Sequence, residues 1–97
     1  MSSRSDYPQT VNNQYTGQYE WDIRGPYGPQ ESPVHKVILK INGVAQSHGV
    51  ARRVNIAKKV AAYLYLHNKC GAAYDPTMRT LCEESDELER FYYDRND

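Results

Sequence analysis

The middle of the chain alternates between apolar and polar residues in the pattern of a β-hairpin. Val37, Leu39 and Ile41 occupy every second position, which is the period of a strand with one buried face. Asn42 and Gly43 follow at once, and both residue types tolerate positive φ, so the pair is the strongest short-range hairpin signal. The sequence therefore predicts two antiparallel strands joined by a tight turn.

A helix is predicted directly after this hairpin, over residues 52–68. Its apolar positions recur at helical spacing and are Val54, Ala57, Ala61 and Leu64. Gly71 is well placed to end the helix. A hairpin that leads into such a helix indicates a helix lying across a small sheet.

A further strand is predicted before the hairpin, over residues 19–24. Tyr19, Trp21 and Ile23 would share one face of it, with charged residues on the other. Two Gly-Pro pairs should then end the strand, because proline lacks the N–H that a ladder needs. Residues 25–33 are therefore expected to form a long loop.

Two short helices are expected towards the ends of the chain. The first covers residues 9–16 and depends on Val11, with Tyr15, to anchor it, because a helix of this length is not stable alone. The second covers residues 86–93, with Ser85 in front of it and acids in its first turn, where they favour the helix dipole.

Together these elements predict an α+β fold: a three-stranded antiparallel sheet with helices packed on one face, in the order α-β-β-β-α. At 97 residues, with nine tyrosines and one tryptophan as its main aromatic content, the chain makes one domain with a modest core. We assign residues 9–69 to this domain, residues 1–8 to a disordered N-terminus, and residues 70–97 to an acidic extension that contains the last helix.

Composition narrows the classes of protein further. No apolar run approaches the roughly 20 residues that span a bilayer, and the first residues lack the apolar segment of a secretory signal. We therefore expect an intracellular protein, cytoplasmic or nuclear, with no membrane partner and no cofactor. Cys70 and Cys82 are too few for a disulfide framework and are expected to be free thiols.

The formal net charge of zero conceals a separation of charge along the chain. Residues 32–74 contain no acid and seven lysines and arginines, whereas residues 75–97 contain eight acids and three arginines. A basic surface suits phosphate binding, because neutralising phosphates releases counterions. The plainer alternative is a solvated face of lysines.

Residues 28–66 carry an ordered set of motifs. Residues 28–31, Gly-Pro-Gln-Glu, are expected to form a loop after a strand, and residues 37–43 are expected to form a strand and its turn. Gly49 falls in the third strand, and residues 57–66 form an alanine-rich basic helix. In this order the chain resembles the double-stranded RNA-binding domain family over residues 8–66, about three fifths of its length. The resemblance implies recognition of duplex RNA by shape, through phosphates and minor-groove 2′-hydroxyls, over about 16 base pairs.

This resemblance implies two groups of RNA-binding residues. The first binds phosphates at the start of the main helix and consists of Arg52, Arg53, Asn55, Lys58 and Lys59. The second reaches a 2′-hydroxyl from the first helix and is Asn12, Asn13 or Gln14.

The chain departs from the family where the family contacts RNA. The helix opening Lys-Lys-x-Ala-Lys becomes residues 54–58 with only its last lysine kept, and Glu31 replaces the loop histidine. The alternative function is therefore a protein-interaction adaptor, or a homodimer, that uses the sheet edge, the helix tyrosines Tyr63 and Tyr65, or the aromatic acidic tail. If the tail folds over the basic face, it lowers nucleic-acid affinity.

Other chemistries find little support in the sequence. Ser47 and His48 are adjacent in a predicted strand, so their side chains point to opposite faces, and we expect no enzyme. His67, Cys70 and Cys82 offer three zinc ligands without the pair that would complete a site. The hairpin and helix also resemble a segment of Alba-type chromatin proteins, but the rest of the chain does not supply that fold.

Overall fold

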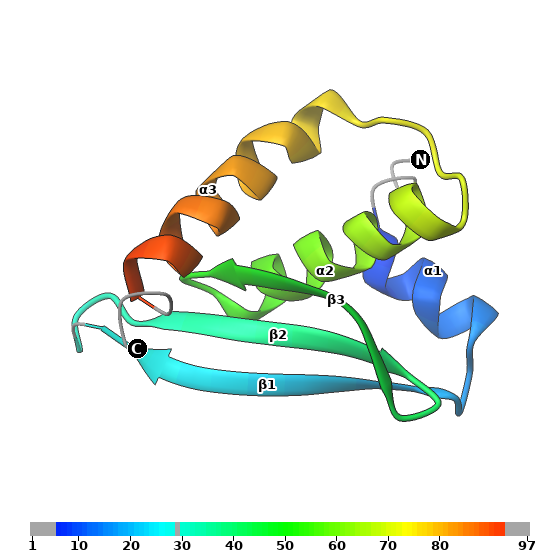
Figure 1. Cartoon of the computed structure of the whole chain (residues 1–97), viewed down its shortest axis with the longest axis horizontal. Helices are drawn as coiled ribbons and strands as arrows, with labels where there is room; N and C mark the ends of the chain where they lie inside the picture. Colours follow the sequence, from blue (N-terminus) through cyan, green and yellow to red (C-terminus); the bar gives the residue numbers. More distant parts are fainter. Residues whose placement is uncertain (1–5, 29, 93–97) are drawn as a thin grey trace.

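The computed structural model describes residues 6–28 and 30–92 and shows an α+β fold (Figure 1). Its elements are α1 (Tyr7–Gln14), β1 (Tyr19–Tyr27), β2 (Val34–Ile41), β3 (Val44–Ala51), α2 (Val54–Lys69) and α3 (Pro76–Tyr92). The strands form one antiparallel sheet in the order β1-β2-β3, and α2 and α3 pack against it. The predicted fold class is confirmed, and α3 extends the order to α-β-β-β-α-α.

Strands β2 and β3 form the predicted hairpin. Ile41 pairs with Val44 across the turn. Asn42 and Gly43 have φ values of 53° and 84°, the left-handed conformation that a two-residue hairpin turn of type I′ requires. The apolar set of the alternating pattern is buried, as predicted: Val37, Leu39 and Ile41.

Helix α2 lies close on the sheet because β3 offers it a glycine. A Cβ atom placed on Gly49 would lie 2.5 Å from the carbonyl oxygen of Ala57 and 2.8 Å from Cβ of Val60. Ser47, on the same face of β3, donates a hydrogen bond from Oγ to the carbonyl of Ala61 at 2.6 Å. The helix backbone therefore contacts β3 directly, and its alanine face is buried.

Helix α1 begins two residues earlier than the predicted start at residue 9. Asp6 caps it by accepting a hydrogen bond from the N–H of Gln9 at 3.3 Å, and Pro8 stands in the first turn, where its missing N–H leaves no bond unmade. Val11 is fully buried, as expected of the anchor. The helix thus includes the last two residues of the segment assigned above to the N-terminus, and residues 1–5 lie outside the described residues.

Strand β1 runs past the Gly-Pro pair that was expected to end it. Its pairing with β2 is regular as far as Arg24, is interrupted there, and resumes at Tyr27, which lies opposite Val34. Because β1 is an edge strand, it needs ladder bonds on one side only, and Pro26 is tolerated at the irregularity. The prediction of a loop from residue 25 was wrong for this reason.

Helix α3 begins at Pro76, not at residue 86 as predicted. Asp75 caps it, accepting from the N–H of Thr77 at 3.0 Å and from its hydroxyl at 2.6 Å. Met78 in the first turn is fully buried in the main core cluster. The first half of α3 is therefore part of the hydrophobic core.

The cap of α3 is tied to α1 and α2 by a tyrosine on each helix. The hydroxyl of Tyr7 donates to Asp75 Oδ2 at 2.5 Å, and the N–H of Asp75 donates to the hydroxyl of Tyr63 at 3.1 Å. Hydrogen bonds from Thr77 and then Tyr7 lower the pKa of Asp75. Burial, reinforced by Asp75, raises the pKa of Tyr7 to about 12.

This lowered pKa makes Asp75 a contributor to acid sensitivity. Its stabilising effect is complete above the unfolded-state pKa of about 3.9 and is lost as pH falls through the lower folded-state pKa. The Asp75→Asn variant keeps a helix cap but carries no charge, so its melting temperature should fall less steeply than that of the wild type between about pH 5 and pH 3. Thermal unfolding at several pH values checks this, and Asp86→Asn, an exposed site on the same helix, should not flatten the curve.

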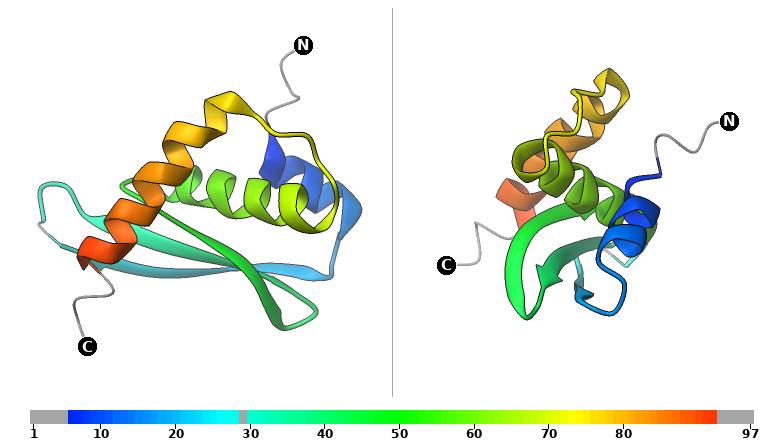
Figure 2. Two further views of the ribbon diagram at one scale, coloured as in Figure 1. Left: turned by 45° about the horizontal axis from the view of Figure 1, so that its top comes forward. Right: turned by 90° about the vertical axis from the view of Figure 1, so that its right-hand side faces the viewer.

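The second half of α3 lies against the last part of β3 (Figure 2). Buried Ser85 accepts a hydrogen bond at Oγ from the N–H of Val50 at 2.9 Å. One turn later, Glu89 pairs with Lys36 Nζ at 3.1 Å and with His48 Nε2 at 2.8 Å. Burial raises the pKa of Glu89, but the hydrogen bonds from His48 and Lys36 outweigh it and lower the pKa. Helix α3 thus occupies the end of the edge at which β3 could pair with another strand, whereas Val44 and Ala45 at the start of β3 are exposed.

Replacing Ser85 by alanine should destabilise the protein by about 1–3 kcal/mol, because the buried N–H of Val50 loses its acceptor. Denaturant unfolding measures this difference. The matched control is Thr80→Ala, which removes a hydroxyl from an exposed position on the same helix and should change stability by less than about 0.5 kcal/mol. Equal effects of the two substitutions would contradict a specific bond between α3 and β3.

Candidate nucleic-acid interface

Four basic residues gather where α2 begins. Arg52 and Arg53 precede the helix, and Lys58 and Lys59 lie in its second turn; we call these four the basic cluster. Both arginines are exposed, and both lysines are half-buried. Asn55, also exposed, stands among them in the first turn. The structure therefore brings together five of the residues predicted to bind RNA.

The first turn of α2 is open to a negative ligand. Its N-cap residue, Arg53, is extended, with φ −125° and ψ 137°, and its side chain makes no capping bond. No acid stands in the first turn of the helix. No side chain in this turn therefore neutralises the positive end of the helix dipole, and that end can attract a phosphate.

Arg52 connects the basic cluster to the loop between β1 and β2. Its Nη1 donates to the carbonyl of Ser32 at 2.5 Å and to the Ser32 hydroxyl at 2.9 Å. Its guanidinium carbon lies 6.0 Å from the ring centroid of Tyr92, at the end of α3. The loop is thus held beside the start of α2 by a residue of the cluster itself.

The same loop is held from its other side by α3. A Cβ atom placed on Gly28 would lie 2.8 Å from Cε1 of Tyr92, so the ring packs closely on the loop backbone. Glu31, which stands in this loop, is exposed. Local sequence patterns do not indicate the contact of Tyr92 with Gly28, because the two residues are far apart along the chain.

A groove lies beside the basic cluster, between α1 and α2. Its volume is about 440 Å³, and it is lined by Asp6, Pro8, Trp21, Asn55, Lys58 and Lys59. Lys58 Nζ lies 5.8 Å from the ring centroid of Trp21, a cation–π arrangement that holds the lysine over the aromatic face. Sequence reasoning placed Trp21 on the sheet but did not connect it with the lysines.

The α1 residues predicted to reach a 2′-hydroxyl lie in different surroundings. Asn12 is half-buried, and its Oδ1 accepts a hydrogen bond from the hydroxyl of Tyr19 at 2.9 Å. Gln14 and Asn13 are exposed, and Gln14 lines a second hollow rather than the Trp21 groove. The structure therefore does not bring Gln14 into the groove beside the basic cluster.

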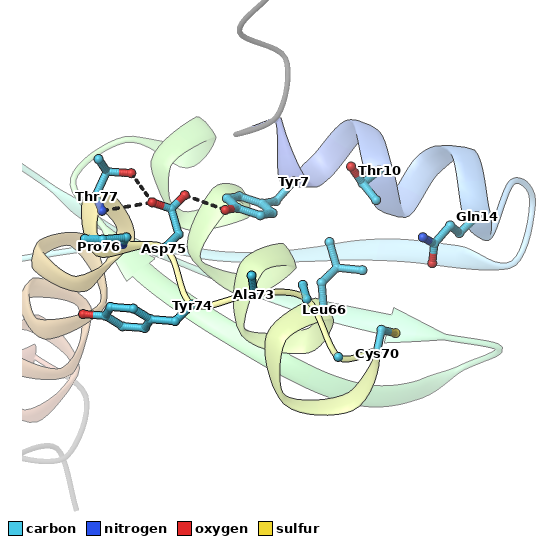
Figure 3. A pocket seen from close by; sticks show the side chains of 12 residues that line it. Tyr7, Thr10, Gln14, Leu66, Cys70, Ala73, Tyr74, Asp75, Pro76 and Thr77 are labelled. Carbon is cyan, nitrogen blue, oxygen red and sulfur yellow. Dashed lines mark hydrogen bonds between the residues drawn. The ribbon is translucent and has the colours of Figure 1, made fainter.

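The second hollow, of about 710 Å³, lies between α1, the end of α2 and the segment that leads to α3 (Figure 3). Tyr7, Asp75 and Thr77 form a hydrogen-bonded set at one end, and Gln14 and Cys70 stand at the other. The carboxylate of Asp75 is already bonded to Tyr7 and Thr77, so it serves the helix cap rather than a ligand.

Two of the seven basic residues in the acid-free segment are paired with acids on the far face of the sheet. Lys36 pairs with Glu89, and Lys40 pairs with Asp22 at 3.1 Å. Hydrogen bonds from Arg24 and then Lys40 lower the pKa of Asp22 well below its usual range. The remaining positive charge is concentrated on α2 and the two arginines before it.

The tyrosines of α2 were predicted to be available for a protein contact, and this prediction was wrong. Tyr63 and Tyr65 are 4% and 9% exposed. Their rings pack edge-on against Tyr7 at 5.0 Å and Tyr15 at 5.7 Å, and Tyr65 donates a hydrogen bond to Tyr15 at 2.8 Å. Helix α1 covers them, which the helical spacing of α2 alone could not reveal.

The alternative chemistries gain no support from the described part of the chain. Ser47 bonds to α2 and His48 to Glu89 of α3, so they point apart as predicted. His67 bonds through Nδ1 to the carbonyl of Ala72 at 2.7 Å. Over residues 6–28 and 30–92 no three metal-binding side chains cluster, and Cys70 and Cys82 are free thiols.

Comparison with family models, curated proteins and solved structures finds no match to this chain. None of the helices in residues 6–28 and 30–92 combines the length and apolar character that crossing a membrane requires.

Proposed function

We propose that this protein binds duplex RNA through the start of α2. The observation that carries the proposal is the basic cluster, four cationic side chains set around a helix N-terminus that has no acid in its first turn. Such a surface suits the phosphates of a duplex, because the cationic side chains, the helix dipole and the backbone N–H groups of the first turn all attract phosphate oxygen atoms.

The loop between β1 and β2 supports the duplex as the form of the ligand. Arg52 bonds to Ser32 of this loop, which holds the loop beside the start of α2. Duplex RNA presents phosphates next to a shallow minor groove, and a loop beside a basic helix end can contact both. The resemblance to the double-stranded RNA-binding domain family supports the same assignment.

Titration of the full chain into a labelled RNA duplex of about 20 base pairs tests the proposal, with the matching DNA duplex alongside and two salt concentrations. We expect binding that prefers RNA, weakens with salt and shows little dependence on sequence. Equal affinity for DNA would indicate that the site binds any polyanion without preference for RNA. Absence of binding at low salt would contradict the proposal.

A protein-binding role is the second candidate. Glu31 in the loop opposes phosphate, and Phe91 near the end of α3 is 56% exposed on an acid-rich helix. An exposed aromatic residue surrounded by charge is typical of a protein contact. The acidic residues of α3 would then select a basic partner, and the RNA titration would show no binding.

A further inference from the structure

The two edge strands of the sheet differ in what lies beside them. At the edge of β3, α3 lies against the end of the strand, where its Ser85 accepts the hydrogen bond of the Val50 N–H. At the other edge, β1 pairs with β2 alone, and within residues 6–28 and 30–92 no element lies along its outer side (Figure 1). An open edge strand offers backbone donors and acceptors to another strand.

The pairing pattern identifies which backbone groups of β1 point outwards. The N–H of Asn42 donates to the carbonyl of Gln18 at 2.7 Å, which fixes the alternation of the antiparallel ladder. Every second residue from Gln18 therefore bonds to β2, and those between direct their N–H and C=O groups away from it. The outward-directed residues are Tyr19, Trp21 and Ile23.

Ile23 also has an incompletely covered side chain. It lies opposite Val37, on the face of the sheet that α2 covers, yet it is 48% exposed whereas Val37 is fully buried. Helix α2 therefore leaves an apolar residue uncovered at the same position where the backbone is unpaired within the described residues.

We propose that β1 pairs with β1 of a second copy of this chain, antiparallel and centred on Ile23. Two-fold symmetry then places Ile23 opposite its own counterpart, so the two exposed side chains cover each other on the helix-facing side. The two sheets join into one of six strands. This inference is independent of RNA binding, since the basic cluster contributes no residue to it.

Charge complementarity supports a second copy as the occupant of this edge. In the same register, Asp22 lies opposite Arg24 of the second copy, and Arg24 opposite the second Asp22. These are non-hydrogen-bonded pairs, in which side chains on neighbouring strands approach most closely. Within one chain, Asp22 already contacts Arg24 at 2.8 Å and Lys40 at 3.1 Å, so the pairing merges two such groups of charges into one.

The interface is short because β1 becomes irregular after Arg24. We therefore expect a weak dimer, at the small end of protein interfaces with less than about 1,200 Å² of total buried surface. Its dissociation constant should lie in the range of about 10 µM to 1 mM.

Charge variants of the full chain test the pairing directly. Arg24→Glu places acids opposite acids, and Asp22→Lys places bases opposite bases, so each variant alone should dimerise at least about tenfold more weakly than the wild type. In an equimolar mixture of the two variants every pair is attractive, and heterodimers should form. Analytical ultracentrifugation at several concentrations measures all three samples, and circular dichroism verifies that each is folded.

If a charge variant loses stability, two further measurements decide whether β1 pairs with β1 of a second copy. In the wild type, hydrogen exchange of the Trp21 and Ile23 amides should slow as concentration rises through the dimerisation range. Val44→Lys, which changes an equally apolar exposed residue at the hairpin, should leave dimerisation unchanged. A wild type that stays monomeric up to about 1 mM, or a dimer that neither charge variant weakens, would overturn the proposal.

Discussion

Replacing Gly49 by valine should destabilise the protein by about 3 kcal/mol or more and leave much of it unfolded at ambient temperature. A Cβ atom at this position would lie 2.5 Å from the Ala57 carbonyl oxygen and 3.0 Å from the Ala61 nitrogen. Both are backbone atoms of α2, which cannot move without separating the helix from the sheet. The added atoms therefore have no space at the closest contact between the two layers.

Urea unfolding followed by circular dichroism measures this loss. Ala45→Val is the matched control, because it enlarges an exposed side chain on the same strand and should change stability by less than about 0.5 kcal/mol. If Gly49→Val were as stable as the control, the close packing of α2 on β3 would be wrong.

Reversing the charge of Arg53 and Lys58 together should weaken duplex RNA binding by about a hundredfold at low salt. The double substitution to glutamate removes two positive charges and adds two negative ones at the start of α2, where phosphate is proposed to bind. The slope of affinity against salt concentration should also become shallower, because fewer counterions are released.

Lys69→Glu is the control for this experiment, since Lys69 is exposed at the opposite end of the same helix. It should alter affinity only slightly. Equal losses from the control and the double variant would indicate diffuse attraction by net charge, and no loss from either would exclude the start of α2 as the binding surface. Melting temperatures of all samples separate a binding defect from unfolding.

The elements predicted well from sequence are those fixed by neighbouring residues. The hairpin follows from Asn42 and Gly43, and α2 follows from the spacing of alanines that meet the sheet. Helix α3 was predicted to start too late, although Asp75 followed by proline is a helix-start signal. Two tertiary contacts hold its early turns: the hydrogen bond of Tyr7 to Asp75 and the burial of Met78. The spacing of apolar residues within the helix does not indicate either contact.

The candidate site, like the fold, could be predicted from the sequence only where its residues are near neighbours along the chain. The members of the basic cluster lie close together in the sequence, so they could be named before the structure was known. The contacts of Trp21 with Lys58 and of Tyr92 with Gly28 join residues from different elements and depend on how β1, α2 and α3 meet. Gln14 was assigned to the site by resemblance, but the position of α1 places it at another hollow.

The position of α3 on β3 also limits how large an assembly of this chain can become. If copies pair through β1 as proposed, α3 stands against the end of the other edge strand of the described sheet, and we expect association to stop at two. Without the contact between Ser85 and Val50, both edges of the sheet would be open to a further strand, and copies could be added at either end. In the proposed assembly, α3 is therefore the element that favours a closed pair over an open-ended fibre.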